Sequence, residues 1–247
     1  MKELEGKRAL VTGGSRGIGA GIAVALAEKG ADVAVTYHQS PDRAAAIVRA
    51  IEANGRRGLA IQADSADPAA VRRSVDEAAE GLGGLDILVN NVGIARMGKF
   101  VDLSLADIDA ILDTNVRATV LASQAAIPHL APGSCIITIG SNAAERGPFV
   151  GLAMYALSKA AMLGFTRHLA RELGPQGITV NLVQPGPTDT ELNPANGGEL
   201  ADLNRRLTSL GRYAAPAEVA AVTAFLASPA ASYMTGSVVT VDGGYNA

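Results

Sequence analysis

The chain has 247 residues, of which 48% are hydrophobic and 18% are charged, and its formal net charge at pH 7 is −3. This mild acidity, without a block of like charges, argues against a nucleic-acid partner, and the sequence has no apolar run of about 18 residues that would predict a membrane span. The opening segment "MKELEGKRALVTGG" lacks the apolar core of a signal peptide, so we expect a cytoplasmic protein.

Short apolar runs rich in valine and isoleucine alternate along the chain with longer, alanine-rich segments. The runs, typical of strands buried on both faces, span residues 8–13, 32–37, 58–64, 86–91, 134–140, 178–183 and 237–243. Helices are expected at roughly 17–29, 41–53, 68–81, 104–130, 154–172 and 216–227. This alternation predicts an α/β fold: one doubly wound Rossmann domain over residues 1–247, with a seven-stranded parallel sheet and helices on both faces.

Residues 184–216 break the alternation, because they are rich in proline, glycine and asparagine and contain one weakly amphipathic stretch near 199–210. A long excursion inside a compact fold is often functional, so we predict a substrate lid at about 187–215. Its three arginines, Arg205, Arg206 and Arg212, would suit an acidic substrate, although such a set is more often a solvated helix face.

Metal and disulfide chemistry is not expected from the cysteine and histidine content. The single cysteine, Cys135, lies in the apolar run "SCIITIG", which predicts a buried core residue. His38, His129 and His168 are scattered, without the spacing of a metal-binding helix, so we assign no metal.

A glycine-rich turn, "TGGSRGIG" at residues 12–19, follows the first predicted strand and opens the first predicted helix. Gly13, Gly17 and Gly19 would let backbone N–H groups approach a pyrophosphate, and the positive end of the helix dipole adds attraction. A glycine cluster alone is a weak signal. Its place after the first strand is where doubly wound folds bind nucleotides, so we predict a nucleotide site.

Tyr155 and Lys159, in the stretch "AMYALSKAAM", are four positions apart and therefore lie on one face of a predicted helix. The pair is either an ordinary surface contact or a phenol whose proton is made labile by a fixed positive charge. A free phenol has a pKa of about 10, and a nearby cation lowers that pKa toward the range of acid–base catalysis. Ser141 follows the fifth strand, where its hydroxyl would orient a substrate oxygen.

Over nearly its whole length the chain resembles the short-chain dehydrogenase/reductase family, whose motifs recur in the same order. The matching positions are Thr12, Gly13, Gly17 and Gly19, Asn90 to Gly93, Asn115, Ser141, Tyr155 with Lys159, Pro185 with Gly186, and "VDGG" at 241–244. Val92 stands where the family has alanine. The resemblance implies a nicotinamide cofactor and hydride transfer to or from a small-molecule carbonyl or alcohol substrate.

The resemblance also implies a role for each member of the catalytic set. Tyr155 would donate a proton to the substrate oxygen, and Ser141 would polarise that oxygen. Lys159 would lower the pKa of the phenol and bind the ribose hydroxyls of the nicotinamide. Asn115 would hold a water that connects Lys159 to solvent as a proton relay.

Cofactor contacts are expected at the glycine turn, at the ends of the second to fourth strands, on the catalytic helix and after the sixth strand. They are Gly13, Ser15, Arg16, Gly17, Ile18, Gly19, Tyr37, His38, Ser40, Asp64, Ser65, Asn91, Gly93, Tyr155, Lys159, Pro185, Gly186 and Thr188. Among these, Asp64 resembles the family's contact to the adenine amino group, and Thr188 would lie beside the nicotinamide carboxamide.

NADP(H) is expected rather than NAD(H). Tyr37 ends the second strand where NAD-preferring relatives carry an acid that binds the ribose hydroxyls and would repel a 2′-phosphate. Arg16 supplies a cation that can pair with that phosphate, and His38 and Ser40 add possible donors.

The leading interpretation is an NADPH-dependent carbonyl reductase similar to 3-oxoacyl-acyl-carrier-protein reductases. An alcohol or sugar dehydrogenase that works in the oxidative direction is an alternative, because the same residues catalyse both directions. A nucleotide-sensing binding protein without catalysis is a third possibility. The resemblance implies a homotetramer built on the helices at 104–130 and 154–172 and on the C-terminal strand.

Overall fold

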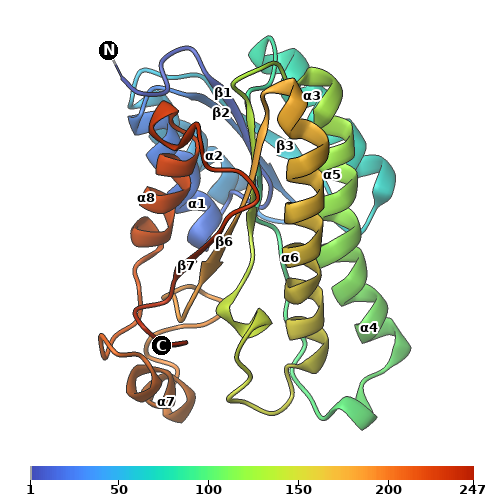
Figure 1. The fold of residues 1–247 in the computed structure, drawn as a ribbon, viewed down its shortest axis with the longest axis vertical. Helices are drawn as coiled ribbons and strands as arrows, with labels where there is room; N and C mark the ends of the chain where they lie inside the picture. The colour runs from blue at the N-terminus through green and yellow to red at the C-terminus, as the bar shows by residue number, and fades with distance from the viewer. Residues whose placement is uncertain (1) are drawn as a thin grey trace.

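A twisted parallel β-sheet runs through the middle of the molecule (Figure 1). The computed structural model describes residues 2–247, and within them the sheet has seven strands in the order β3-β2-β1-β4-β5-β6-β7, each parallel to its neighbours. The strands are β1 (Arg8–Val11), β2 (Asp32–Tyr37), β3 (Gly58–Gln62), β4 (Ile87–Asn90), β5 (Cys135–Ile139), β6 (Thr179–Pro185) and β7 (Val238–Val241). The predicted fold class is confirmed.

Helices cover both faces of this sheet (Figure 1). They are α1 (Gly17–Glu28), α2 (Pro41–Glu52), α3 (Pro68–Leu82), α4 (Leu105–Leu112), α5 (Ala118–Ala126), α6 (Ala153–Leu173), α7 (Glu199–Leu207) and α8 (Pro216–Leu226). Side chains of α1, α2 and α8 share one apolar core with the sheet, and side chains of α3, α5 and α6 share the other. The sheet is thus buried on both faces, which explains why its strands are apolar throughout.

Most helix ends lie within a few residues of their predicted positions, because proline and glycine residues mark them in the sequence. Pro68 is the first residue of α3, where the Asp67 carboxylate accepts a hydrogen bond from the N–H of Ala69 at 2.8 Å. Gly83 ends the same helix with a left-handed φ of 76°. Cys135 is buried in β5, as predicted, and burial raises the pKa of its thiol to about 12.

The helix predicted over 104–130 is broken into segments. A π-helical turn, Asp113–Arg117, separates α4 from α5, and a 3₁₀ turn follows at Ile127–His129. A π-turn inserts an extra residue into a helix and often lies at a functional site. Apolar periodicity does not reveal this one, because α4 and α5 continue in the same direction on either side of it.

The predicted lid contains α7, which lies outside both helical layers, near the C-terminus (Figure 1). Asn204 of α7 donates a hydrogen bond to the Tyr213 hydroxyl at 2.8 Å, which ties the helix to the end of the lid. Two of the lid arginines considered for an acidic substrate already have partners: Arg205 pairs with Asp202 at 2.6 Å, and Arg212 pairs with Glu218 at 2.7 Å.

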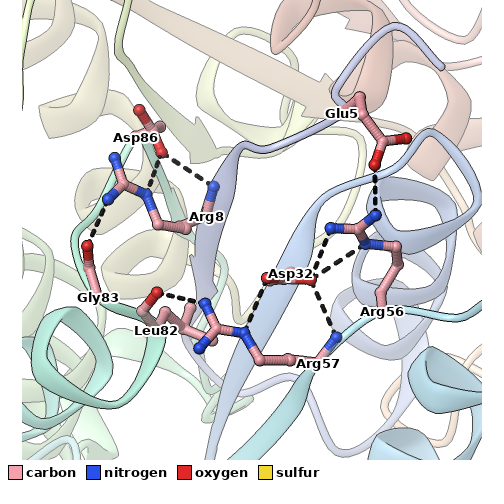
Figure 2. A network of polar contacts seen from close by, with 8 residues as sticks. All are labelled: Glu5, Arg8, Asp32, Arg56, Arg57, Leu82, Gly83 and Asp86. Carbon is pink, nitrogen blue, oxygen red and sulfur yellow. Dashed lines mark hydrogen bonds and ion pairs between the residues drawn. The ribbon is translucent and has the colours of Figure 1, made fainter. Parts of the chain in front are cut away.

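A network of arginines and carboxylates fixes the amino ends of the strands (Figure 2). Asp32, the first residue of β2, accepts hydrogen bonds from Arg56 Nε at 3.0 Å and from the backbone and side chain of Arg57, both at 2.9 Å. Burial would raise the pKa of Asp32, but these bonds outweigh burial and hold it below its usual value. Asp86 holds Arg8 of β1 at 2.7 Å in the same way. These contacts cross-link the amino ends of β1 and β2 to the segments that precede β3 and β4.

Two further observations concern the chain as a whole. Within residues 2–247, none of the helices combines the length and the apolarity that crossing a bilayer requires. The same residues contain no group of three or more histidine, cysteine and acidic side chains placed to hold a metal ion.

Candidate active site

The carboxyl ends of β5 and β6 and the first turn of α6 border one cavity of about 510 Å³. Ser141 follows β5, Tyr155 lies in the first turn of α6, Pro185 ends β6, and Gly186 directly follows that strand. All four line this cavity. The structure therefore brings the predicted phenol and hydroxyl together at the edge of the sheet where open α/β folds bind ligands.

Ser141 is held firmly at the mouth of this cavity. It caps a short 3₁₀ turn at Asn142–Ala144, where its Oγ accepts a hydrogen bond from the N–H of Ala143 at 3.2 Å. The residue is 8% exposed, and its hydroxyl is close enough to the phenol of Tyr155 to affect its titration. A hydroxyl so placed can donate its hydrogen to a carbonyl oxygen that also contacts Tyr155.

Lys159 lies one helical turn behind Tyr155, with its Nζ 5.9 Å from the centre of the phenol ring. The ammonium is 5% exposed and donates a hydrogen bond to the carbonyl of Ile139, the last residue of β5, at 2.9 Å. Burial lowers the pKa of Lys159 to about 8. The lysine therefore titrates near the physiological range, as acid–base machinery requires.

The pKa of Tyr155 differs from the sequence-based expectation. We expected Lys159 to lower it, but in the free protein burial raises the pKa of Tyr155, and the hydrogen bond with Ser141 opposes that rise without cancelling it. Lys159 Nζ lies 5.9 Å from the centre of the ring and donates its hydrogen bond to the carbonyl of Ile139. The phenol is accordingly a protonated acid before substrate enters, as a proton donor must be.

Asn115 lies in the π-turn and fastens three segments together. Its side chain accepts a hydrogen bond from the N–H of Ile94 at 2.8 Å and donates to the carbonyl of Ile94 and to Ser158 Oγ, both at 2.9 Å. Ser158 in turn donates to the carbonyl of Tyr155 at 2.7 Å. A methyl group built on Gly93 would lie 3.2 Å from Lys159 Nζ and 3.5 Å from Asn115 Oδ1, so both polar groups face this glycine.

Ser158, the serine inside the Tyr155–Lys159 stretch, was missed by the sequence reasoning. Its position between the two catalytic candidates was visible, but its partner is 43 residues away in sequence and depends on the π-turn. It links Asn115 to the backbone of the catalytic helix, so it holds the phenol in register with the rest of the site.

The glycine turn adopts the conformation that its sequence predicts. Gly13 and Gly17 have left-handed φ angles of 64° and 55°, which residues with side chains rarely adopt. The amide of Asn91, after β4, donates to the carbonyls of Thr12 at 2.9 Å and Gly13 at 3.2 Å. Asn91 thereby anchors the turn, and Ser15 and Ile18 follow within the same turn, with Ile18 reaching the main cavity.

The residues predicted to contact the adenine and its ribose lie at or beyond the carboxyl ends of β2 and β3. His38, after β2, faces Asp64, after β3, with Nε2 and Oδ2 3.7 Å apart, and Ser65 lines a separate small cavity that reaches toward Thr12. Tyr37 is the last residue of β2, and Ser40 immediately precedes α2. These predicted contacts are thus gathered near the glycine turn, but outside the main cavity.

Arg16 is not free in this structure. Its guanidinium pairs with Glu191 of the lid, Nη1 to Oε2, at 3.3 Å, and Arg43 in the first turn of α2 pairs with the other oxygen of the same carboxylate. Arg43 and Glu191 were both missed from the sequence, since only the path of the lid brings them to Arg16.

The residues predicted to border the nicotinamide lie at the end of β6 and in the loop that follows it. A methyl group on Gly186 would lie 2.6 Å from the Cα of Asp242, so only glycine fits against this part of the "VDGG" segment. Thr188 is buried, donates to the carbonyl of Gly186 at 3.0 Å and lines the main cavity. The cavity wall also includes Leu192 and Leu200 from the lid, which makes it largely apolar opposite the catalytic groups.

Comparison with known proteins decides the family. A family model described as enoyl-(acyl carrier protein) reductase matches residues 13–246, nearly the whole chain. This chain belongs to the short-chain dehydrogenase/reductase family. It is therefore an oxidoreductase with a single Rossmann-type domain.

Three relatives show how close the likeness is. A short-chain dehydrogenase from Burkholderia cenocepacia, solved in complex with NADP, is 57% identical, with a TM-score of 0.98, and the match covers 99% of this chain and 100% of that one. A cyclic-di-GMP-binding biofilm dispersal mediator protein from Escherichia coli is 42% identical over the full length of both chains. A 3-oxoacyl-[acyl-carrier-protein] reductase from Staphylococcus aureus is 39% identical over 96% of this chain and 97% of its own length.

Proposed function

We propose that this member of the short-chain dehydrogenase/reductase family is an NADPH-dependent carbonyl reductase that converts a ketone, such as a 3-oxoacyl group, to an alcohol. The observation that carries the proposal is the shared cavity: Ser141 and Tyr155 line it together, and the buried Lys159 lies one helical turn behind the phenol. Similarity to a 3-oxoacyl-[acyl-carrier-protein] reductase supports the substrate class.

The residues present fit a nicotinamide adenine dinucleotide phosphate. The left-handed Gly13 and Gly17 support a turn whose backbone approaches a pyrophosphate. Lys159 Nζ, which lies 3.2 Å from a Cβ built on Gly93, is the donor that we assign to the ribose hydroxyls. Two arginines, Arg16 and Arg43, frame the expected position of the 2′-phosphate. The NADP bound by the Burkholderia relative supports the same choice of cofactor.

The chain's own residues supply acid catalysis and orientation. When bound, NADPH supplies the hydride for the carbonyl carbon. Tyr155 donates its proton to the carbonyl oxygen, which Ser141 holds by a second hydrogen bond, so the negative charge that develops on that oxygen is stabilised at once. Lys159 favours the resulting phenolate, and the hydrogen bonds of Asn115 with Ile94 and Ser158 keep the helix in position.

Oxidation of an alcohol would use the same groups in reverse, with Tyr155 accepting the proton, so the balance of oxidised and reduced cofactor would set the direction. A nucleotide-binding protein without turnover is the second candidate, favoured by the name of the Escherichia coli relative. Ser141 and Tyr155 share the wall of one cavity, where the two hydroxyls have a clear use in polarising and protonating a carbonyl oxygen, so we favour the reductase.

The test is a substrate panel with the purified wild-type protein. NADPH oxidation is followed at 340 nm with β-ketoacyl thioesters, β-ketoesters, simple ketones and an enoyl thioester, and cyclic di-GMP is titrated in parallel. We expect turnover with at least one carbonyl compound and a preference for NADPH over NADH. Cyclic di-GMP binding with no turnover of any carbonyl or alcohol would instead establish the binding-protein alternative.

A further inference from the structure

Glu191 lies at the tip of a tight turn. This turn contacts the arginines near the starts of α1 and α2, and it also lines the main cavity. The turn is closed by backbone hydrogen bonds between Thr190 and Asn193, at 3.3 and 3.1 Å, so Glu191 and Leu192 form its tip. Glu191 faces the arginines, whereas Leu192 lines the main cavity. A methyl group on Gly17 would lie 3.3 Å from the Cγ2 of Thr190, so the turn rests directly on the glycine turn.

The carboxylate of Glu191 bridges two cations from separate elements. One oxygen pairs with Arg16, which immediately precedes α1, and the other pairs with Arg43 in the first turn of α2. Within the described chain, Arg16 and Ser40 at these two helix starts make no side-chain capping hydrogen bond, so both helix dipoles add positive potential there. Two guanidinium groups, two helix N-termini and one carboxylate converge on this place.

This carboxylate is weakly held. The side chains of Arg16, Arg43 and Glu191 are 65%, 50% and 54% exposed, and ion pairs so open to water are worth little. A phosphate monoester carries up to two negative charges and accepts from both guanidinium groups, so it competes well for the same donors.

We propose that Glu191 is a displaceable counter-ion that occupies the 2′-phosphate site of NADP(H) in the free protein. The 2′-phosphate takes its place between Arg16 and Arg43, and the released Glu191 frees the 190–193 turn, which carries Leu192 of the substrate cavity with it. This inference rests on the proposed function, and it adds Arg43 as a residue that determines cofactor preference. It also links the phosphate that distinguishes NADPH from NADH to the wall of the substrate pocket.

Cofactor affinities directly test whether the 2′-phosphate displaces Glu191. NADPH and NADH are titrated by fluorescence into the wild-type protein and into Glu191→Gln, Arg43→Gln and Glu199→Gln. Glu199 is the matched control, because it is an exposed carboxylate of the same lid at the start of α7. We expect Glu191→Gln to tighten NADPH binding about two- to fivefold while NADH and the Glu199→Gln control change by less than about 1.5-fold. Arg43→Gln should weaken NADPH binding alone.

Hydrogen exchange provides a second readout that needs neither hydride nor substrate. Adenosine 2′,5′-bisphosphate should speed amide exchange in residues 189–196, and adenosine 5′-monophosphate should not. Unchanged exchange with both nucleotides, or equal shifts of NADPH and NADH affinity in Glu191→Gln, would overturn the counter-ion inference and leave the reductase proposal standing. If the wild-type protein binds neither NADPH nor NADH, both the counter-ion inference and the reductase proposal are wrong.

Discussion

Tyr155 and Lys159 illustrate how burial adapts two ordinary side chains to proton transfer. Burial disfavours the charged form of each group, so the pKa of the phenol is raised and the pKa of Lys159 falls to about 8. The two shifts keep the phenol protonated and make the lysine responsive near neutral pH. Loss of the Lys159 proton above pH 8 removes the cation that favours the phenolate, so reduction should slow there.

The buried, charged Lys159 should also lower the free energy of unfolding, by an amount that depends on pH. Lys159 keeps its proton up to pH about 10.5 in the unfolded chain but loses it near pH 8 in the folded protein, so between these values the unfolded state binds more protons. The contribution of Lys159 to the free energy of unfolding should therefore become less unfavourable across this window, by up to about 3 kcal/mol. Lys159→Met lacks the effect. Its stability advantage in urea at pH 7 should shrink toward pH 10, and an advantage independent of pH would contradict the assignment.

The glycine turn positions the start of α1 through very close packing. A Cβ on Gly19 would lie 2.4 Å from the amide nitrogen of Asn91 and 2.5 Å from the carbonyl oxygen of Gly13, and the second of these is backbone that cannot rotate away. The hydrogen bond between Asn91 and Gly13 passes through this space. A side chain here must push the turn away from β4.

Gly19→Ala should therefore lower the free energy of unfolding by about 1–3 kcal/mol and weaken NADPH binding about tenfold. Gly21→Ala is the matched control in the same helix, since its Cβ would meet Pro216 at an ordinary 3.4 Å. It should be neutral or slightly stabilising, because alanine favours helix. Urea denaturation and cofactor titration of both variants measure this, and equal behaviour of the two would contradict the packing argument.

Local features of the fold could be predicted from sequence patterns, whereas contacts between distant segments could not. Buried strands and proline- or glycine-marked helix ends are local features, so β2 and α3 were predicted nearly to the residue. The Tyr155–Lys159 spacing is also local, and the structure places Tyr155 with Ser141 in one cavity, whereas the catalytic roles of these residues stay predictions. The contacts of Ser158 and Glu191 depend on how a π-turn and a long lid run through space, and residue types alone do not determine such paths.

Large apolar side chains remain exposed on the helices that the family resemblance assigns to subunit contacts. Leu105 of α4 is 72% exposed and Leu157 of α6 is 51% exposed, and both helices belong to the same side of the sheet (Figure 1). Exposed apolar surface of this kind is typical of subunit contacts. The homotetramer that the family resemblance implies stays a prediction, and Leu105 and Leu157 are the positions at which we expect a subunit contact.

The predicted tetramer would have a mass of about 100 kDa, four times that of the 25.1 kDa chain. Light scattering on the purified protein measures this directly. Replacing Leu105 and Leu157 with glutamate should shift the mass downward, because a charge within an apolar contact is poorly solvated. A wild-type mass of one chain would contradict the assembly.

The central claim is that the phenol of Tyr155 delivers the proton to a carbonyl oxygen in the main cavity, and one comparison tests it most directly. The turnover number for NADPH oxidation with the best carbonyl substrate is measured for the wild type and Tyr155→Phe, with the NADPH dissociation constant of each. We expect the phenylalanine variant to lose turnover at least about 100-fold while its NADPH affinity stays nearly unchanged. Full turnover by the phenylalanine variant would contradict it.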